Sequence, residues 1–472
     1  MSADSDRNSS SFRDHLATAD RTGKRIWVFP AKLKGRLHRA RSIVAVGLLA
    51  FLFAGPFIKV GGQPILLLNI LERKFIIFGL AFWPQDFHLF VLAAITLAVF
   101  VVLFTAVFGR LFCGWICPQT VFLEMVFRRI EYWIEGGPAK QRKLARQKWD
   151  EEKIAKRTVK HVVFYAISFL IGNTFLAYII GSERLFKIMT DPPGEHIAGL
   201  SAMIIFSFLF YGVFAWFREQ ACTLVCPYGR LQSVLIDKNT IVVAYDHKRG
   251  EPRQPMERNQ ERANAGDCVE CQACVHVCPT GIDIRNGTQL ECVNCTACID
   301  ACNRTMNKVG LPEGLIRYSS EEAIAGGRKF RFTGRIGIYS VVLTILLSIM
   351  VFLFATRTDI ETTILRSPGA LFQRTNNGMI RNQYSAKVVN KTFDAIPVSF
   401  RIKSPQQATV TMVRGDLVVD PDGIAETAFF VNIPESGLFS PSTMIAIEVV
   451  SGERVIEEIR TTFMGPRKQG QQ

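Results

Sequence analysis

The segment CVECQACVHVCPTGIDIRNGTQLECVNCTACIDAC, residues 268–302, carries eight of the chain's twelve cysteines in two matching runs. Each run has the spacing Cys-x2-Cys-x2-Cys-x3-Cys, and Pro279 follows the first run. Three thiolates spaced in this way hold one side of an iron–sulfur cubane, while the fourth ligand comes from a distant part of the chain. The segment therefore predicts a bacterial-type two-cluster ferredoxin domain of the α+β class.

In this pattern the last cysteine of each run crosses over to the other cluster. The predicted ligands of one 4Fe-4S cluster are Cys268, Cys271, Cys274 and Cys302. The predicted ligands of the other are Cys292, Cys295, Cys298 and Cys278. Zinc is the alternative metal, but zinc sites use paired knuckles and not two four-cysteine runs. His276 is expected to stay outside the ligand set, and the second run lacks the usual proline after its last cysteine.

The remaining four cysteines form two copies of a Cys-x3-Cys-Pro motif, Cys113 with Cys117 and Cys222 with Cys226. Each copy follows an apolar stretch and a basic residue, and precedes a helix-compatible run at 119–133 or 228–236. A proline after the second cysteine fits the first position of a helix, where an N–H is not needed. The two copies therefore predict an internal repeat of span, basic residue, motif and surface helix.

Cysteines at helix N-termini are expected to have a lowered thiol pKa, here for Cys117 and Cys226, with Arg110, Arg218 and Arg230 adding to the effect. All four motif thiols are expected to be partly ionised and to form one soft site, which would favour Cu(I) or an iron–sulfur centre over hard cations. The four motif cysteines are therefore the candidate catalytic and metal-binding residues. Copper, a third cluster or a reversible dithiol all fit this spacing, and inert buried thiols or a transient disulfide are the alternatives without a metal.

The chain has 472 residues, of which 49% are hydrophobic and 21% charged, and its formal net charge is +15. This composition excludes a disordered chain and a disulfide-built secreted mini-domain. Five uncharged stretches approach the ~20 residues that cross a hydrocarbon core. They lie at 42–58, 87–109, 161–182, 196–217 and 336–356, and a shorter apolar run at 75–85 is expected to be interfacial.

The distribution of Lys and Arg predicts the orientation of these five spans. Residues 1–41, 110–160 and 218–335 would share one side and carry 10, 12 and 16 basic residues, against 3 and 2 in the loops 59–86 and 183–195. The positive-inside rule places the richer side in the cytoplasm. The basic run 140–148 is then explained by topology and anionic headgroups, so no nucleic-acid partner is predicted.

The last 116 residues change to short β-branched runs separated by turn formers such as Asp420-Pro421-Asp422-Gly423. This pattern predicts an all-β sandwich of about seven strands, without the cysteine and tryptophan of antibody domains. The predicted domains are a solvated basic tail at 1–41, a membrane domain with four spans at 42–237, a ferredoxin-like domain at 238–335, a fifth span at 336–356 and an external β-sandwich at 357–472.

Three further features are weaker. His88 and His196 lie at the outer ends of their spans and could ligate a haem or an incoming metal ion. The stretch Trp83-Pro84-Gln85-Asp86-Phe87 could line an entry path, although an aromatic interfacial anchor explains it equally well.

Taken together, the spans, both Cys-x3-Cys-Pro motifs, the double ferredoxin run, the stretch 82–87 and the terminal β-domain resemble the cytochrome c oxidase accessory protein family known as CcoG, FixG or RdxA. The resemblance covers nearly the whole chain beyond the N-terminal tail. It implies a bacterial inner-membrane protein that assists assembly of the cbb3-type haem-copper oxidase by reducing Cu(II) to Cu(I). It also implies an immunoglobulin-like terminal domain and a role for the Cys-x3-Cys-Pro cysteines in copper chemistry.

The expected function is therefore one-electron transfer from a cytoplasmic or quinol donor, through two 4Fe-4S clusters, to copper near Cys113, Cys117, Cys222 and Cys226. Oxidase subunits or copper chaperones are the expected protein partners, alongside membrane lipid. One alternative is a quinol-oxidising membrane ferredoxin resembling the NapH-type subunits of nitrate reduction. Another is a non-enzymatic assembly scaffold whose clusters are structural.

Overall fold

The structure is a computed structural model that describes residues 17–19, 22, 24–60, 63–70, 74–77, 80–83, 86–256, 264–327, 333–375, 377–413, 415, 417–438 and 440–466. Contacts divide the chain into two compact units, and each unit is built from two segments. The first unit joins residues 1–56 to 91–349, and the second joins 57–90 to 350–472. The domain boundaries expected from the sequence remain predictions, and the contact division differs from them by placing 57–90 with the C-terminal residues.

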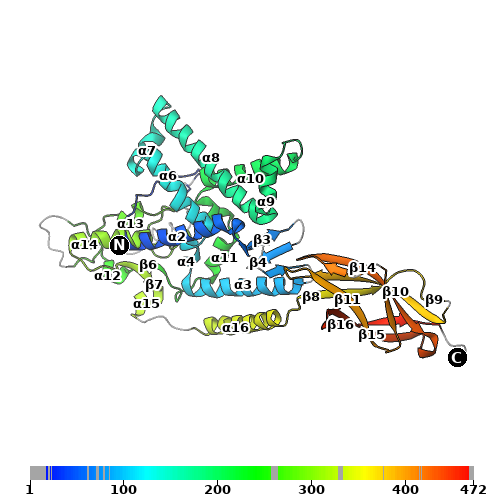
Figure 1. Cartoon of the computed structure of the whole chain (residues 1–472). Coiled ribbons are helices and arrows are strands. Elements are labelled where there is room, and N and C mark those ends of the chain that lie inside the picture. The colour runs from blue at the N-terminus through cyan, green and yellow to red at the C-terminus, as the bar shows by residue number, and fades with distance from the viewer. Residues whose placement is uncertain are drawn as a thin grey trace. The chain divides into compact units, whose positions relative to one another are not determined.

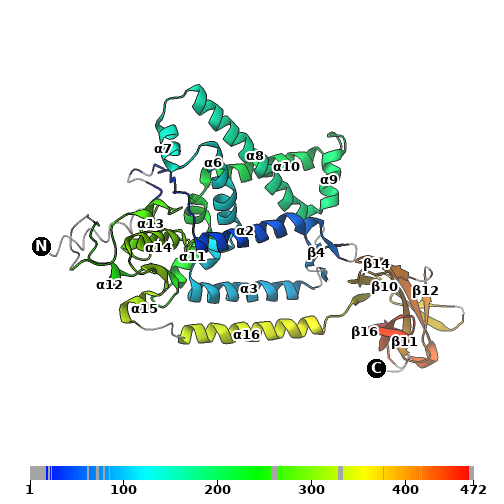
Figure 2. The same ribbon diagram turned by 60° about the vertical axis from the view of Figure 1, so that its left-hand side comes forward.

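Within the described residues, five helices are long and apolar enough to cross a membrane, which confirms the predicted number of spans. Figures 1 and 2 show them as the longest coiled ribbons. They are α2 (Arg36–Ala54, continued to Phe57), α3 (Phe87–Phe108), α8 (Glu151–Ile180), α10 (Ile197–Gly212, continued to Phe217) and α16 (Gly334–Ala355). The third helix begins ten residues before the predicted apolar stretch because Asp150 caps it, accepting a hydrogen bond from the backbone N–H of Lys153 at 2.9 Å. Hydropathy detects only the apolar part of such a helix, and the charged first turns are set by the cap.

Shorter helices of the first unit connect these spans. They are η1 (Gly55–Phe57, which leads into the second unit), α4 (Leu111–Trp115), α5 (Pro118–Val121), η3 (Phe122–Phe127), α6 (Arg128–Ile134), α7 (Pro138–Arg146), α9 (Ser182–Thr190), η4 (Val213–Phe217), η5 (Ala221–Val225) and α11 (Pro227–Leu235). Helices α8 and α10 pack closely, since a Cβ on Gly172 would lie 3.5 Å from the Cα atom of Ser207. An aromatic cluster of Phe122, Phe127, Phe164 and Phe214 fills the space where η3, α8 and η4 meet.

The ferredoxin-type region has two antiparallel strands, β6 (Val242–Tyr245) and β7 (Ile316–Ser319). Its short helices are α12 (His247–Gly250), α13 (Ala273–His276), η6 (Ile284–Asn286), α14 (Ala297–Val309) and α15 (Glu321–Gly326). The core between them includes Met306, Leu315 and Ile316, each about 1% exposed, together with cysteines from both runs. The cysteine loops are therefore packed against a small apolar core.

The N-terminal residues around Pro30 and Ala31 contact this region and helix α6, which corrects the expectation of a solvated tail for this part of the chain. The backbone N–H of Ala31 donates to the carbonyl of His276 at 2.7 Å, and the hydroxyl of Tyr132 donates to the carbonyl of Pro30 at 3.0 Å. Composition alone gave no sign of these contacts, because they use backbone groups that every sequence carries.

The second unit contains the β-sandwich, seen at the C-terminal end of the ribbon in Figure 1. One sheet has the order β12-β14-β10-β8, with β9 also paired to β10, and the other has the order β13-β11-β15-β16. The strands are β8 (Ile360–Arg366), β9 (Gln373–Arg374), β10 (Met379–Asn390), β11 (Ile396–Ser404), β12 (Thr409–Met412), β13 (Leu417–Val419), β14 (Ile424–Pro434), β15 (Ser442–Ser451) and β16 (Arg454–Met464), with a single helical turn at η7 (Glu435–Gly437). The all-β sandwich is confirmed, and short strands such as β9 and β13 raise the number above the expected seven.

Short strands between α2 and α3 belong to the same unit. They are β1 (Lys59–Val60), β2 (Gln63–Pro64), β3 (Leu66–Asn69), β4 (Lys74–Ile77) and β5 (Leu80–Phe82), and the last three form one antiparallel sheet. After them, the buried carboxylate of Asp86 pairs with Lys391 at 2.6 Å and with Arg357 at 2.9 Å. Trp83 donates its indole N–H to Asp422 at 3.0 Å. Trp83 and Asp86, from the stretch expected to be an entry path or an interfacial anchor, therefore attach this segment to the β-domain, and Pro84 and Gln85 lie outside the described residues.

Candidate redox and metal centres

The first predicted ligand set surrounds one small cavity. Its wall includes Cys268, Cys271, Cys274 and Cys302, the four residues that the crossover pattern groups together. Cys268, Cys274 and Cys302 are buried, whereas Cys271 is exposed. Because α14 carries Cys302 at its second turn, the helix returns this cysteine to the loop of the first run. The arrangement fits a cubane held by three local thiolates and one distant thiolate.

The second predicted set is also brought together. Cys278 lies close enough to Cys292, Cys295 and Cys298 to interact with them electrostatically. Burial raises the pKa of Cys292 to about 12 and that of Cys295 to about 11. These thiols would be protonated before a metal binds, so cluster assembly must release protons. The ligand roles of all eight cysteines remain predictions that this grouping supports.

Both runs share an unusual backbone conformation that the spacing did not reveal. Glu270 and Gln272 flank Cys271 with φ of 52°, and Asn294 and Thr296 flank Cys295 with φ of 53° and 65°. Residues other than glycine seldom adopt such angles, which concentrate at functional sites. The repeated conformation shows that the two runs fold as structural copies of one another.

The two Cys-x3-Cys-Pro motifs also occupy matching positions. Cys117 and Cys226 are the residues immediately before α5 and α11, and each proline takes the first helical position, as predicted. One π-helical turn, η3, lies shortly after the first motif. Another, η5, contains Cys222, the first residue of the second motif. Such turns are rare and occur often at functional sites.

The helix after the first motif is not a surface helix. Phe122 and Phe127 are 2% and 0% exposed, so η3 passes through the interior of the unit, whereas α6 buries Arg128 and Glu131 on one face and exposes Trp133 on the other. The sequence-based expectation rested on helix compatibility, which does not determine how much of a helix is covered. Burial of this helix holds the first motif against the neighbouring elements.

The four motif cysteines form one group, in which each copy contributes a polar contact to the other. The amide of Gln232, on α11 after the second motif, donates to the sulfur of Cys113 at 3.3 Å. In return, Thr120, which follows the first motif, hydrogen-bonds Cys222. Arg110 donates to the carbonyl of Gly229 at 2.8 Å. These contacts join the two copies of the motif at the site.

Burial changes the expected acidity of two of these thiols. It raises the pKa of Cys113 to about 11, although the Gln232 hydrogen bond and Arg110 oppose the change. It raises the pKa of Cys222 to about 12, with the neighbouring motif cysteines adding to the effect. The expectation of four partly ionised thiols is therefore wrong for Cys113 and Cys222, because desolvation of a thiolate outweighs the nearby positive charge.

The first motif lies directly against the second ferredoxin run. A Cβ on Gly114 would come within 2.5 Å of the carbonyl oxygen of Val293 and 2.7 Å of that of Asn294. The indole of Trp115 donates to the hydroxyl of Tyr318 at 3.1 Å, and this hydroxyl donates to the carbonyl of Asn294 at 3.2 Å. The residues between Cys113 and Cys117 are therefore in contact with the residues between Cys292 and Cys295.

Arg218 does not serve the thiols as expected. Its guanidinium forms a two-pronged pair with the buried carboxylate of Glu131, at 2.9 and 2.6 Å. The backbone of Arg218 has φ of 51°, and its carbonyl accepts from the side chain of Gln119 at 3.1 Å. Since its charge is matched by Glu131, this arginine positions the loop before the second motif.

A second buried arginine connects this charge network to the ferredoxin loops. Arg128, 2% exposed, pairs with Glu124 at 2.7 Å and lies 3.6 Å from Glu219. It also donates to the carbonyl of Pro279, directly after Cys278, at 3.0 Å. The sequence signal for such a network is weak, because charged residues on helices usually face water.

The two histidines at the outer ends of the spans differ in their surroundings. His88 is exposed on α3. His196 pairs with Asp191 at 2.9 Å and forms with it and Glu195 a group whose ligand atoms lie within 4.8 Å of one another. This is the one such group among the described residues, and the cysteine sets are more widely spaced.

Comparison with known proteins agrees with this geometry. The model of the "4Fe-4S dicluster domain" matches residues 217–321, the "4Fe-4S binding domain" matches 90–139, and the "IG-like fold at C-terminal of FixG" matches 350–466. The nitrogen fixation protein FixG of Rhizobium meliloti is 30% identical over 94% of both chains. Proteins RdxA and RdxB of Cereibacter sphaeroides are 36% and 33% identical, covering 77% and 84% of this chain and 79% and 86% of theirs.

The chain belongs to the FixG/RdxA family. This FixG/RdxA protein is accordingly an iron–sulfur membrane protein of the oxidoreductase type, with an immunoglobulin-like C-terminal domain. The ferredoxin-type protein NapH of Escherichia coli also matches, with 25% identity over 40% of this chain and 67% of that protein.

One of these matches bears on the Cys-x3-Cys-Pro group of the FixG/RdxA protein. The 4Fe-4S binding domain at 90–139 contains Cys113 and Cys117 but ends far before the double ferredoxin run. Reasoning from sequence missed the residues that surround this group, chiefly Gln232, Thr120, Gly114 and Trp115. The position of Gly114 and Trp115 inside a repeated motif was the only available signal for any of them.

Proposed function

We propose that this protein reduces Cu(II) to Cu(I) during assembly of a cbb3-type cytochrome c oxidase. It would lie in the bacterial inner membrane, with the N-terminus and ferredoxin-type domain in the cytoplasm and the β-domain in the periplasm. Copper is the substrate, and oxidase subunits or copper chaperones are the receiving partners. Membership in the FixG/RdxA family and the basic cytoplasmic loops support this proposal.

The observation that carries the proposal is the contact between Gly114-Trp115 and Val293-Asn294. When bound, 4Fe-4S clusters supply single electrons, which matches the one-electron reduction of Cu(II). The eight ferredoxin cysteines fit these clusters by number, grouping and burial. Cys113, Cys117, Cys222 and Cys226 would receive the copper, and the hydrogen bonds from Trp115 to Tyr318 and from Tyr318 to Asn294 connect the first motif to the second ferredoxin run.

The chemistry of the four motif thiols favours the product over the substrate. Cu(II) prefers nitrogen and oxygen ligands, whereas thiolates stabilise Cu(I). Because burial keeps Cys113 and Cys222 protonated, binding of copper displaces their protons, and Gln232 and Thr120 remain to orient the sulfur atoms. A third cluster and a reversible dithiol are the alternatives to copper at these four cysteines. The match of a 4Fe-4S binding domain to residues 90–139 supports the third cluster.

Cupric reduction can be tested on anaerobically purified protein reduced with dithionite and then freed of excess reductant. Addition of Cu(II) should give Cu(I), detected with a Cu(I)-specific chelator, in proportion to the reduced clusters. The double variant Cys113→Ala/Cys117→Ala should lower this rate to that of protein-free solution while it retains the iron of the ferredoxin region. Undiminished cupric reduction by that variant with its clusters in place would refute the proposed route.

The match to NapH favours a second candidate, a quinol-oxidising ferredoxin whose electrons go to a partner other than copper. The two functions differ in what oxidises the reduced protein. Rapid reoxidation by Cu(II) supports cupric reduction. Cluster reduction by a quinol followed by no reaction with Cu(II) would support the second function instead.

A further inference from the structure

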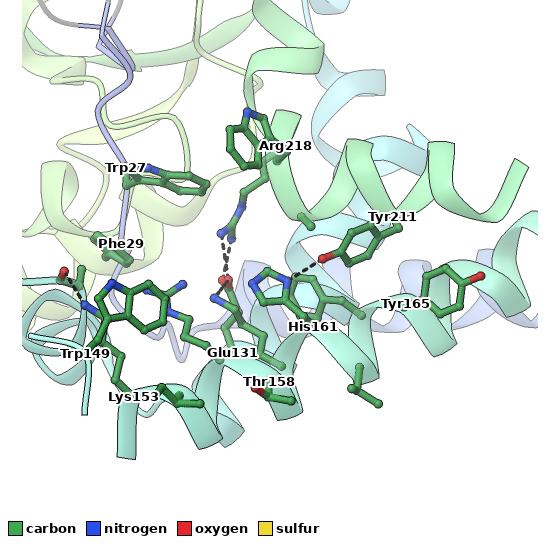
Figure 3. Close-up of a pocket in the computed structure, with 18 of the residues that line it drawn as sticks. Trp27, Phe29, Glu131, Trp149, Lys153, Thr158, His161, Tyr165, Tyr211 and Arg218 are labelled. Atoms are coloured by element: carbon green, nitrogen blue, oxygen red, sulfur yellow. Dashed lines mark hydrogen bonds and ion pairs between the residues drawn. The ribbon is translucent and has the colours of Figure 1, made fainter. Parts of the chain in front are cut away.

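A large groove, with no cysteine in its lining, lies beside the buried ion pair of Glu131 and Arg218. Its volume is about 1240 Å³, and Figure 3 shows the side chains that line it. The walls come from the N-terminal segment with Trp27 and Phe29, from helices α6, α7 and α8, and from α10 with η4. All of these elements belong to the first unit. Neither the predicted clusters nor the copper site uses this groove.

The groove is polar at one end and apolar at the other. Its lining follows α8 from Lys153 to Tyr165, a distance of about 18 Å at the usual rise per residue. The charged end has Lys153 and Arg157, and the other end has Val162, Tyr165 and Phe208. A groove of this kind at the end of two membrane spans suits a ligand with a polar head and an apolar tail.

The cations in the wall are already matched by protein groups. Lys160 pairs with Glu135 at 2.8 Å, Arg157 lies 3.5 Å from the same carboxylate, and Arg218 is held by Glu131. Lys153 donates to the backbone carbonyls of residues 145 and 147 at 3.3 and 2.5 Å. A phosphate head group would have to break these pairs, so the charge distribution favours a neutral ligand.

One neutral polar pair lies between the two ends of the groove. The hydroxyl of Tyr211 and the Nδ1 atom of His161 are 2.8 Å apart, as the dashed line in Figure 3 shows. The rings of Tyr165 and Phe208 lie 4.9 Å apart next to this pair. A neutral imidazole can accept a proton from a bound hydroxyl at one nitrogen while the other nitrogen keeps its bond to the tyrosine.

We propose that this groove binds a membrane quinol, with the ring between the aromatic side chains and the His161–Tyr211 pair, and the isoprenoid tail along α8 and α10. The inference deepens the proposed function, because it names the class of electron donor. Oxidation of one quinol to the quinone releases two electrons and two protons. The electrons match two one-electron iron–sulfur acceptors, and the protons leave one after the other through the His161 imidazole to water at the charged end.

The groove is connected to the ferredoxin region by side chains in its wall. Glu131 and Arg218 belong to the same buried network as Arg128, which donates to the carbonyl of Pro279 beside Cys278. The segment with Trp27 and Phe29 continues to Ala31, which donates to the carbonyl of His276. A donor in the groove therefore lies next to the structures that hold the second predicted cluster.

Binding can be measured without reference to copper, because Trp27, Trp149 and Trp216 line the groove and quinones quench tryptophan fluorescence. Titration of the full-length protein in nanodiscs with decylubiquinone should give saturable quenching. Thr158→Phe, which fills the groove, should weaken binding at least about tenfold, a change of roughly 1.4 kcal/mol. Val159→Phe is the matched control, since Val159 is an exposed neighbour on α8 outside the lining. Equal quenching in both variants would overturn the proposal.

Turnover supplies the second test. Decylubiquinol should reduce the clusters of the wild type, seen as bleaching of their visible absorption, and His161→Leu should slow this reaction while dithionite still reduces the variant fully. Dithionite-driven cupric reduction by Thr158→Phe should remain intact, so failure of the groove and failure of cupric reduction are distinguishable. Native mass spectrometry gives the opposing outcome. The proposal is refuted if the wild type retains an anionic phospholipid that Thr158→Phe loses and that added quinone does not displace, because the groove would then be a lipid site.

Discussion

Asp300 caps the first membrane helix, since its Oδ2 atom accepts a hydrogen bond from the backbone N–H of His38 at 2.7 Å. Its Oδ1 atom accepts from the N–H of Leu37 at 3.2 Å. Asp300 lies on α14, between Cys298 and Cys302, and Gly35 leaves room for it, because a Cβ there would be 2.1 Å from the carboxylate carbon. The start of the membrane domain is thus fixed by a residue within the second cysteine run.

Asp300→Ala should remove this cap and lower the free energy of unfolding by about 1 to 2 kcal/mol. It should also loosen α14 and so reduce retention of iron during purification. Asp300→Asn keeps a side-chain acceptor and should restore most of the stability. Thermal unfolding in detergent and iron analysis would test this, and equal loss in both variants would show that the charge matters and not the cap.

Gly114→Ala should disturb the contact between the first Cys-x3-Cys-Pro motif and the second ferredoxin run. The new methyl group would meet two backbone carbonyls, which cannot rotate away, so we expect a stability loss of about 1 to 3 kcal/mol. The rate of cupric reduction by dithionite-reduced protein should fall as well. Gly212→Ala is the control, because a Cβ there would have no neighbour within 4 Å. If Gly114→Ala reduces copper at the wild-type rate, the contact between the first motif and the second ferredoxin run is not needed for cupric reduction.

The crossover of the ligands can be tested by pairs of cysteine variants. Cys302→Ser together with Cys268→Ser should cost only one cluster, about four iron atoms, because both residues are predicted to serve the same cubane. Cys302→Ser together with Cys292→Ser should cost both clusters. Iron analysis and paramagnetic resonance of the reduced proteins would distinguish the two, and the reverse result would mean that each run holds its own cluster.

Asp86→Asn should weaken the attachment of the segment 57–90 to the β-domain. It would leave the buried Lys391 and Arg357 without part of their counter-charge, which should lower the free energy of unfolding by about 3 kcal/mol. Fluorescence of Trp83 reports on this region, since its indole bonds Asp422. Asp394→Asn, at an exposed position, should be neutral. Similar unfolding of the two variants would contradict the assignment.

The same residue gives a pH dependence. Burial favours the neutral form of Asp86, but Lys391 and Arg357 outweigh it and hold the pKa of this carboxyl below its usual value. A lowered folded-state pKa stabilises the protein above the unfolded value, about 3.9, and this contribution is lost as the pH falls further. Wild type should therefore lose its stability advantage over Asp86→Asn below about pH 4. A constant difference at lower pH would argue against the ion pair.

Local patterns in the sequence predicted most of the architecture. Each of these patterns is visible within a short stretch of chain. Cysteine spacing indicates cluster ligands, an uncharged stretch indicates a membrane span, and β-branched runs indicate strands. For this reason the five spans and the all-β domain were confirmed. The two ferredoxin runs and the paired motifs were found in the same way. Burial was not predictable in this way. The expectation that all four motif thiols are partly ionised failed for Cys113 and Cys222, because burial raises the pKa of both.

The sequence by itself determined how the twelve cysteines are spaced for iron–sulfur ligation and how many helices can cross a membrane, because both properties depend on spacing along the chain. Tertiary structure alone decided that Asp300 caps a helix 262 positions away, that Gln232 reaches Cys113, and that His161 and Tyr211 share one groove. Such contacts join distant segments through packing and hydrogen-bond geometry. No local pattern encodes them, since the same side chains would face water if the helices packed differently.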